Sequence, residues 1–313
     1  ELYEDYRLYD RDVYLYPAKD LIFFQADIHG NLLTRERMKV LAALLQKKGV
    51  TVITSMGGCM DYLLPLSVLE EHTLHFGADS PLDMENLKKK LLGMGYERCA
   101  QAEAPGQFCF GEESLIFFRL QRIIPCVLNC GGDEIDSIRS FDAESQRSIE
   151  NLEEITIYPA SEIVLSPQVL KEGLERIEKE KTAAVKKFRD AFLTEEGARL
   201  KQSVDEAVDC LKEFEDFLVA EHFLRYFYKD AVTFTDYFTT EETLVILDET
   251  NRLAEQGNAV ETEFRESMEH RLEKGYLLSG QADLLISCKE TIHKLNKKNG
   301  VSLCTIEQKR ENG

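Results

Sequence analysis

The sequence has no tryptophan, no Cys-x-x-Cys pair and no long apolar run. Its eight cysteines lack metal-ligand spacing, which is typical of reduced cytosolic thiols, so we expect a cytoplasmic protein without a bound metal. No apolar segment approaches the roughly 20 residues that a membrane-spanning helix needs. Basic residues are scarce too: 38 Lys and Arg stand against 57 Asp and Glu, for a net charge of −19. Because nucleic-acid binding requires clustered basic residues, this balance argues against a chain whose whole surface contacts DNA or RNA.

The sequence does contain enough apolar material for about two packed domains. The chain has 313 residues, and a typical domain has roughly 100–200. A hydrophobic content of 43% argues against wholesale disorder. The chain starts at Glu1 rather than Met and ends on a polar segment, so we expect a fragment of a longer protein.

The first third alternates strand and helix patterns. Residues 13–16 (Val-Tyr-Leu-Tyr) and 50–53 (Val-Thr-Val-Ile) predict two strands, and between them Met38 and Leu41 recur at helical spacing after a possible cap at Thr34. A strand, a helix and a strand at this spacing form a βαβ unit, which implies a parallel sheet. The fold class predicted here is therefore α/β.

From about residue 72 the pattern changes to that of a small α+β module. A short helix is predicted from Asp83 to Met94, and short apolar runs with turn signals follow it. Residues 155–158 (Ile-Thr-Ile-Tyr) predict the strand by which the chain leaves this module.

The remaining chain is mostly helical in pattern. Residues 168–228 place apolar positions on one stripe, including Leu200 and Val204. Residues 244–247 predict a further buried strand, and a long charged helix is predicted from about 251 to 274 with a break near Gly257.

One predicted strand ends in two carboxylates of the kind found in nucleotide-hydrolysing sites. In P-loop ATPases a buried strand followed by Asp-Glu, as at Asp248 and Glu249, places the first carboxylate on Mg²⁺ and the second near the attacking water. Such a site also needs a G-x-x-x-x-G-K-[ST] loop, and no segment fits that pattern. We therefore interpret Asp248 and Glu249 as a degenerate Walker B-like strand end, and we expect no cofactor and no catalytic residue in this chain.

Longer motifs resemble a known family. The run Gly-Asp-Glu-Ile-Asp-Ser-Ile-Arg-Ser-Phe-Asp at 132–142, continued at 145–148 and 157–162, resembles the amino-terminal region of the bacterial transcription-repair coupling factor (Mfd). Further segments that fit the same family lie at 16–20, 35–38, 95–98, 105–108 and 245–249. The related excision-repair helicase subunit UvrB shares the run at 132–142, but it has a working phosphate loop and a Tyr-rich DNA-clamping hairpin. Here no segment fits the phosphate-loop pattern, and residues 14–31 continue through the place where the hairpin would be inserted.

The resemblance implies a degenerate P-loop, RecA-like parallel-sheet domain interrupted by a small α+β module. Its first part would be residues 1–71, the inserted UvrA-binding module 72–159, and the second part 160–313. In the family, this region does no chemistry: it brings UvrA to stalled RNA polymerase and restrains the full-length protein. The polymerase-binding domain, and the motor that uses ATP and Mg²⁺ on DNA, are expected outside this chain. The alternatives are a fragment of a UvrB-like ATPase and a decayed gene fragment without function.

Residues 109–131 match the family in length but not in sequence. If each codon is read from one base earlier, Ser114–Arg119 can become Ile-Ile-Asp-Ile-Phe-Pro and Val127–Gly131 can become Arg-Ile-Glu-Leu-Trp, which is the family pattern. We therefore infer a compensated frameshift. Because altered alternation would turn polar groups inward, we expect residues 109–131 to pack worse than either flank.

The shifted segment includes the positions that resemblance assigns to UvrA binding. In the family, two arginines and an aromatic residue form that surface, and arginine suits it because its planar group makes paired, charge-assisted hydrogen bonds to carboxylates. The matching positions here are Gly111, Val127 and Gly131, which carry neither the charges nor the ring. We expect this chain to bind UvrA weakly.

Overall fold

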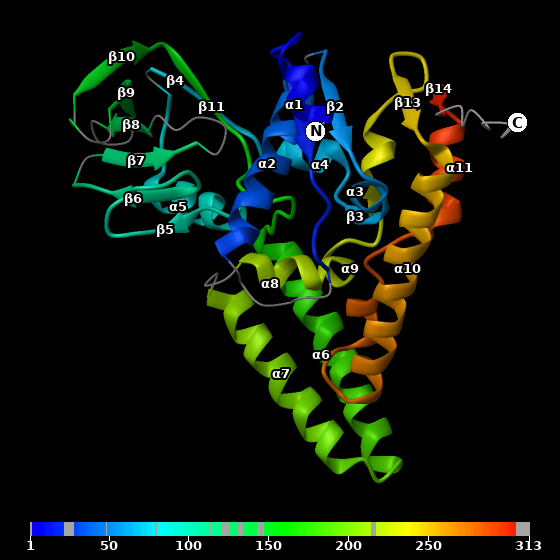
Figure 1. The fold of residues 1–313 in the computed structure, drawn as a ribbon. Coiled ribbons are helices and arrows are strands. Elements are labelled where there is room, and N and C mark those ends of the chain that lie inside the picture. The colour runs from blue at the N-terminus through cyan, green and yellow to red at the C-terminus, as the bar shows by residue number, and fades with distance from the viewer. Residues whose placement is uncertain are drawn as a thin grey trace, which may run out of the picture.

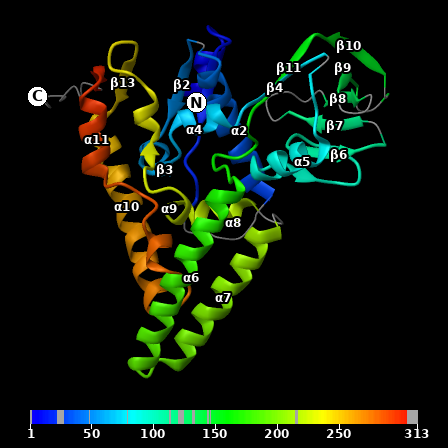
Figure 2. The same ribbon diagram turned by 180° about the vertical axis from the view of Figure 1, so that it is seen from behind.

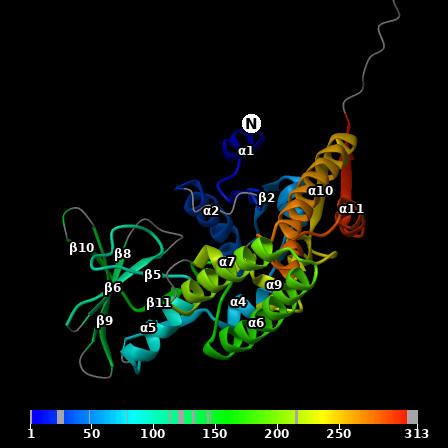
Figure 3. The same cartoon turned by 90° about the horizontal axis from the view of Figure 1, so that it is seen from below.

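The structure is a computed structural model that describes residues 2–21, 28–47, 49–78, 80–112, 114–119, 125–130, 134–142, 145, 147–213 and 217–304. A small sheet lies on one side of the molecule, a βαβ unit lies in the centre, and long helices extend from the centre (Figure 1). Seen from below, the small sheet and the carboxyl-terminal helices lie on opposite sides (Figure 3).

The predicted βαβ unit is present. After α1 (Leu2–Arg7), strand β1 (Val13–Tyr16) leads to helix α2 (Ile28–Leu45) and strand β2 (Thr51–Thr54), and β1 pairs with β2 in parallel. The prediction that Thr34 caps the helix is wrong, because α2 already includes residues 28–33.

Short elements follow β2 and bring distant parts of the chain together. They are α3 (Met56–Met60), β3 (Tyr62–Leu63), α4 (Leu66–Glu71) and β4 (Leu74–Gly77). Strand β3 pairs with β12 (Val232–Thr233), and β4 pairs antiparallel with β11 (Glu154–Ile157). The chain therefore enters and leaves the segment between β4 and β11 along two neighbouring strands.

That segment forms a module of one helix and a six-stranded sheet. Helix α5 (Met84–Gly93) begins where the sequence predicts, because the Asp83 carboxylate accepts a hydrogen bond from the Asn86 amide at 3.0 Å. The sheet order is β10-β9-β8-β7-β6-β5. Its strands are β5 (Glu97–Arg98), β6 (Gln107–Phe110), β7 (Ser114–Phe118), β8 (Pro125–Cys130), β9 (Ile135–Phe141) and β10 (Ser148–Leu152).

The expectation that residues 109–131 pack poorly is wrong for the part that the structure describes. Strands β7 and β8 are the two central strands of the sheet. Leu115, Phe117, Cys126 and Leu128 are fully buried, while Ile116, between two of them, is half-buried. The side chains alternate inward and outward as in an ordinary strand.

The alternation of buried and half-buried side chains is kept because both readings of the segment place apolar residues at the inward-facing positions. The re-read text places Ile at 115 and 117, where the chain has Leu115 and Phe117. It places Ile at 128 and Leu at 130, where the chain has Leu128 and Cys130. The period of two, rather than the identity of each residue, decides which face is buried.

In the described part of the chain, four helices lie between the module and β12. They are α6 (Pro167–Asp190), α7 (Thr194–Glu213), α8 (Phe217–His222) and α9 (Leu224–Phe227), which confirms the helical prediction for this region. Helix α6 starts at Ser166, whose hydroxyl accepts from the Val169 amide at 3.3 Å. Helices α6 and α7 form a long hairpin that projects from the molecule (Figure 2).

The carboxyl-terminal part contains a second parallel pair of strands. Its elements are η1 (Phe234–Tyr237), β13 (Leu244–Asp248), α10 (Thr250–Glu273), η2 (Ser279–Ala282), α11 (Cys288–Asn296) and β14 (Asn299–Leu303). Strands β13 and β14 pair in parallel and, among the described residues, pair with no other strand. The prediction of a buried strand at 244–247 is wrong in its burial: Leu244 and Ile246 are 64% and 51% exposed, because no other described element packs over their side chains.

Helix α10 runs without the predicted break at Gly257. A side chain at this position would bring its Cβ within 2.5 Å of Cys288 Sγ and 3.3 Å of Met56 Cε. Glycine is therefore present because α10 packs closely against α11 and α3, and the backbone stays helical through it.

The largest hydrophobic cluster among the described residues connects the module to the rest of the chain. It contains Phe108 and Ile138 from the sheet, Leu41 from α2, and Leu200 and Phe264 from the long helices. Leu165 continues this core and its amide donates to the Gly93 carbonyl at 2.8 Å. The module and its surroundings thus share one apolar interior.

Candidate functional site

Among the predicted partner-binding positions, Val127 lies on the outer face of the six-stranded sheet, the face opposite the apolar core. Val127 is at the middle of β8, half-buried, between Ile116 of β7 and Arg139 of β9. Gly111 lies in the turn before β7, where its amide donates to the Ser114 carbonyl at 2.8 Å. The structure therefore places Gly111 and Val127 on neighbouring parts of one sheet, whereas Gly131 lies outside the described residues.

Arg139 provides a cationic group on this outer face. In the orientation of the Asn129 amide that satisfies both neighbours, its oxygen accepts from Arg139 Nη2 at 2.8 Å and from Ser137 Oγ at 2.9 Å. This part of the face can therefore offer one fixed guanidinium beside an apolar side chain, Val127. An arginine at Val127 would add a second guanidinium next to the first.

Asp248 and Glu249 lie together at the end of β13, as predicted. Asp248 is exposed, and Glu249 begins α10 with a left-handed backbone (φ 55°) while its amide donates to the Leu303 carbonyl at 2.9 Å. Their strand belongs to the separate β13–β14 pair rather than to the β1–β2 pair. Among the described residues, no group of three or more His, Cys, Asp or Glu side chains is arranged to bind a metal ion.

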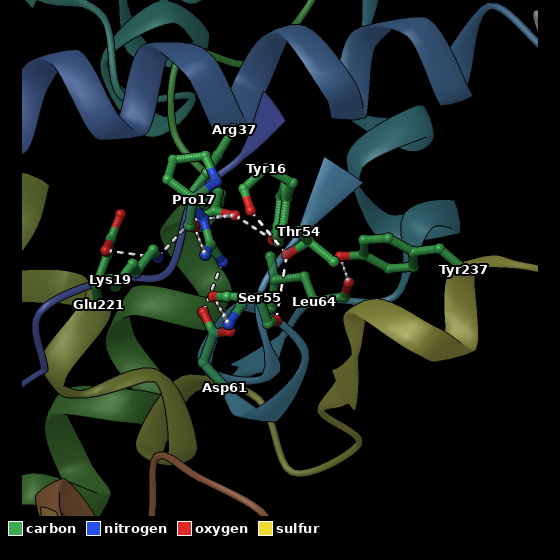
Figure 4. Close-up of polar contacts among 12 residues, drawn as sticks. Tyr16, Pro17, Lys19, Arg37, Thr54, Ser55, Asp61, Leu64, Glu221 and Tyr237 are labelled. Atoms are coloured by element: carbon green, nitrogen blue, oxygen red, sulfur yellow. Dashed lines mark hydrogen bonds and ion pairs between the residues drawn. The ribbon is translucent and has the colours of Figure 1, made fainter. Parts of the chain in front are cut away.

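The structure also contains a buried cluster of charged residues that the sequence reasoning missed. We call Lys19, Arg37, Asp61, Glu162 and Glu221 the ionic cluster. The Arg37 guanidinium is fully buried: its Nη2 donates to Asp61 at 2.5 Å and its Nε to Glu162 at 2.9 Å (Figure 4). Lys19 pairs with Glu162 and, at 2.8 Å, with Glu221.

Aromatic side chains enclose the ionic cluster. The Tyr16 hydroxyl donates to Glu162 Oε1 at 3.0 Å, and the Arg37 guanidinium lies 4.0 Å from the centre of the Tyr16 ring. The other face of that ring stacks on Phe234 at 3.8 Å. Tyr237, close by, donates to the Leu64 carbonyl at 2.5 Å. A cation between carboxylates and an aromatic ring, away from water, interacts more strongly than the same groups at a surface.

The charges of the cluster alter the ionisation of its members. Burial alone would raise the pKa of Glu162, but Arg37 and Lys19 outweigh burial and lower this pKa to about 2. Burial would likewise lower the pKa of Lys19, yet Glu162 and Glu221 raise it above its ordinary value. Burial and the charge of Lys19 lower the pKa of nearby His222 to about 3. At neutral pH the Glu162 carboxylate is thus charged and lies beside a cationic Lys19, while the His222 imidazole is neutral.

The position of the cluster limits what this edge of the sheet can bind. Arg37 Nη1 donates to the Pro17 carbonyl at 2.8 Å, just after β1, and the Thr54 hydroxyl at the end of β2 donates to the Tyr16 carbonyl at 2.7 Å. Ligands of open α/β sheets bind beyond such carboxyl ends of the strands. Here a cavity of about 20 Å³ adjoins the cluster, which is room for one water-sized molecule, and Arg37 and Lys19 are already paired with carboxylates.

No spacing pattern could have revealed the ionic cluster, because its members are far apart in the chain. Arg37 and Glu162 are separated by 125 positions. The signal was nevertheless present in the family-like segments at 16–20, 35–38 and 157–162, which contain Tyr16, Lys19, Arg37 and Glu162. The fold brings these separate segments together around Arg37.

Comparison with known proteins identifies the module. Residues 74–163 match the family model described as the UvrB interaction domain. The match begins at β4 and includes the whole six-stranded sheet, β11 and Glu162. Separately, among the described residues no helix is long and apolar enough to cross a membrane.

Most of the chain is similar to transcription-repair-coupling factors. It is 28% identical over 271 residues to that of Bacillus subtilis (87% of this chain, 23% of the relative) and 26% identical over 275 residues to that of Staphylococcus haemolyticus (87% and 23%). The factor of Staphylococcus aureus MRSA252 is 26% identical over 285 residues (90% and 24%). The chain spans about a quarter of the length of these relatives. It therefore contains a segment that matches the UvrB interaction domain, within a sequence that is similar over most of its length to transcription-repair-coupling factors.

Proposed function

We propose that this chain is a non-catalytic recruitment and regulatory module of a transcription-repair coupling factor, which links stalled RNA polymerase to excision repair through UvrA. The observation that carries the proposal is the match of residues 74–163 to the UvrB interaction domain, because these residues form the complete six-stranded sheet. Contacts with RNA polymerase and DNA would be made by other regions of the full-length protein.

The surroundings of the module support a non-catalytic role. We interpret β1, α2 and β2, with β13 and β14, as the remains of a P-loop, RecA-like fold divided by the inserted module into parts 1–71 and 160–313. The ionic cluster occupies the strand ends where such a fold would bind phosphates, and Asp248 and Glu249 lie on an exposed strand without a phosphate loop. ATP and Mg²⁺ would then serve only the motor of the full-length protein.

Calorimetric titration of UvrA tests the proposed partner. The chain is compared with a variant that restores the family residues, Gly111→Arg with Val127→Arg and Gly131→Trp. Anchor residues of this kind each contribute about 2 kcal/mol or more, so the two arginines alone correspond to about a thousandfold, and we expect the variant to bind at least about a thousandfold more tightly. The control, Ala183→Arg with Asn258→Arg, adds the same charge at exposed helix positions and should not improve binding. If restored and original chains bind equally, the assigned contact surface is wrong; if neither binds, the proposed role is wrong.

ATP binding distinguishes this proposal from a UvrB-like ATPase fragment. We expect no binding of Mg-ATP at about micromolar concentration, because the chain has no loop to surround the phosphates. Measurable micromolar binding would favour the ATPase alternative.

We further infer that residues 109–131 are encoded in a compensated shifted frame. The six-stranded arrangement is compatible with either reading, so the DNA sequence decides. Codons that cannot yield the family text in the other frame would overturn this inference.

A further inference from the structure

A groove of about 980 Å³ lies between the module and the α6–α7 hairpin. We call it the junction groove. Its apolar lining comes from three helices: Leu92 of α5, Leu170 and Leu174 of α6, and Val208 of α7. These side chains are half-buried, since they pack on the core from one side and border the groove from the other.

The rim of the junction groove carries more positive than negative charge. Lys89 of α5, Lys171 and Lys179 of α6 and Lys212 of α7 line it, against Glu175 and Glu178. All six side chains belong to exposed residues. Within the described part of the chain, Lys89, Lys171 and Lys179 have no ion-pair partner, and Lys212 lies 4.0 Å from Asp209. The rim therefore has a net positive charge, although the whole chain has a net charge of −19.

We propose that the junction groove binds an amphipathic helix of a partner protein, with acidic residues on both sides of its apolar stripe. Leu170 and Leu174 are four positions apart and form a ridge along α6, against which apolar residues at i, i+3, i+4 and i+7 of another helix can pack. The lysines around this ridge would pair with the acidic residues. Opposite charges around an apolar groove favour this partner over a basic one and accelerate its binding.

Such a partner would contact two parts of the molecule at once. Leu92 belongs to the UvrB interaction domain, whereas Leu170, Leu174 and Val208 belong to the hairpin beyond it. A bound helix would therefore fix the orientation of the domain relative to the hairpin. This binding is independent of UvrA docking on the outer face of the sheet.

Fluorescence anisotropy with two labelled peptides of about 18 residues tests the proposal. Both have leucines at i, i+3, i+4 and i+7 spacing; one has glutamates and the other lysines at the flanking positions. We expect the acidic peptide to bind the 313-residue chain at least about tenfold more tightly than the basic one. The difference should shrink when salt is raised from about 0.05 M to about 0.5 M.

Two charge-reversal variants locate the site. Lys171→Glu with Lys179→Glu should weaken binding of the acidic peptide about tenfold or more. The control, Lys186→Glu with Lys187→Glu, changes the same number of exposed charges on the same helix outside the groove and should have little effect. Leu174→Asp should abolish binding of both peptides, with circular dichroism to confirm that the variant is folded.

Three outcomes would overturn the proposal. These are equal affinity for the two peptides, equal loss in both charge-reversal variants, and no binding of either peptide. Sedimentation velocity tests whether a second copy of this chain occupies the groove instead. A dimer that Leu174→Asp dissociates would show this, and it would also contradict the proposal of an acidic partner helix.

Discussion

Removal of the Arg37 guanidinium would leave the buried carboxylates of Asp61 and Glu162 without their shared cation. Both side chains are at most 4% exposed. Breaking a buried ion pair by removing one partner costs about 3–5 kcal/mol, so Arg37→Met should lower the free energy of unfolding by that amount. Urea unfolding measures it, and the exposed Arg98→Met control should change stability by less than about 0.5 kcal/mol.

A triple variant separates charge from packing at this site. Adding Asp61→Asn and Glu162→Gln to Arg37→Met removes the unpaired charges and should recover part of the lost stability. A triple variant that is less stable than Arg37→Met would show that the carboxylates contribute independently of Arg37.

His222 should make the protein sensitive to mild acid. Its pKa is lowered to about 3 in the folded chain, from an ordinary value of 6.5, by burial and by the charge of Lys19. Below pH 6.5 the unfolded chain therefore binds a proton that the folded chain does not. Stability is complete above pH 6.5 and falls toward pH 3, by at most about 1.4 kcal/mol per pH unit for one proton.

The His222→Gln variant measures that contribution. Between about pH 6.5 and 4.5 its stability should depend less on pH than that of the original chain. At lower pH both proteins should lose stability, because the pKa of Glu162 is lowered from 4.5 to about 2 and its protonation weakens the ionic cluster. Parallel stability curves above pH 4.5 would rule out His222 as the group responsible.

Among the elements, β8 offers a direct comparison of the two faces of the sheet. Leu128 is fully buried, whereas the neighbouring Val127 is half-buried on the outer face. Leu128→Ala should cost about 2–5 kcal/mol of stability and Val127→Ala less than about 1 kcal/mol. Equal losses in urea unfolding would mean that the strand is not packed in the register observed.

Helix α10 provides a test of why glycine is present inside a long helix. In isolation, Gly257→Ala should stabilise the helix by roughly 1 kcal/mol. Here the added methyl group would collide with Cys288, so we expect a loss of about 1–3 kcal/mol instead. Thermal unfolding monitored by circular dichroism measures the sign of the change. The exposed neighbour supplies the control: Asn258→Ala should be neutral or slightly stabilising.

For the whole molecule, the shared core predicts one cooperative unfolding transition. Phe108 of the module and Leu200 of the hairpin belong to the same hydrophobic cluster. Scanning calorimetry should therefore show a single transition in which calorimetric and van't Hoff enthalpies agree. The excised module, residues 74–163, should melt at a lower temperature than the same residues do in the full chain. Two separate transitions in the full chain would contradict a continuous interior.

Local pattern predicts much of this fold, because the period of apolar residues depends on neighbours in the sequence. It is sufficient for the βαβ unit, for α5 with its Asp83 cap, and for the helices between 167 and 227. It fails where a distant segment decides the outcome. Position 257 requires glycine because Cys288 packs against it, and Ile246 is exposed because no other strand of the described chain covers β13. Arg37 is buried because Glu162, 125 positions away, neutralises it.

The candidate binding face was predictable only in part. The family-like segments were enough to find the module, which the match over residues 74–163 identifies. They did not predict that β7 and β8 would remain central strands, since that outcome depends on alternation that both readings of the segment preserve. The junction groove could not be predicted either, because its lining comes from three helices that only the fold brings together.

The antiparallel pairing of β4 with β11 has a mechanical consequence. A domain joined through one peptide segment can swivel freely, since each residue of the connection rotates about two dihedral angles. The UvrB interaction domain is instead joined to its neighbours through two strands that pair from Leu74 with Ile157 to Gly77 with Glu154. Twisting this double stalk would break its hydrogen bonds, so it resists torsion. A pull on a protein docked to the sheet would therefore be transmitted as torque to the body of the molecule rather than being lost in a flexible hinge.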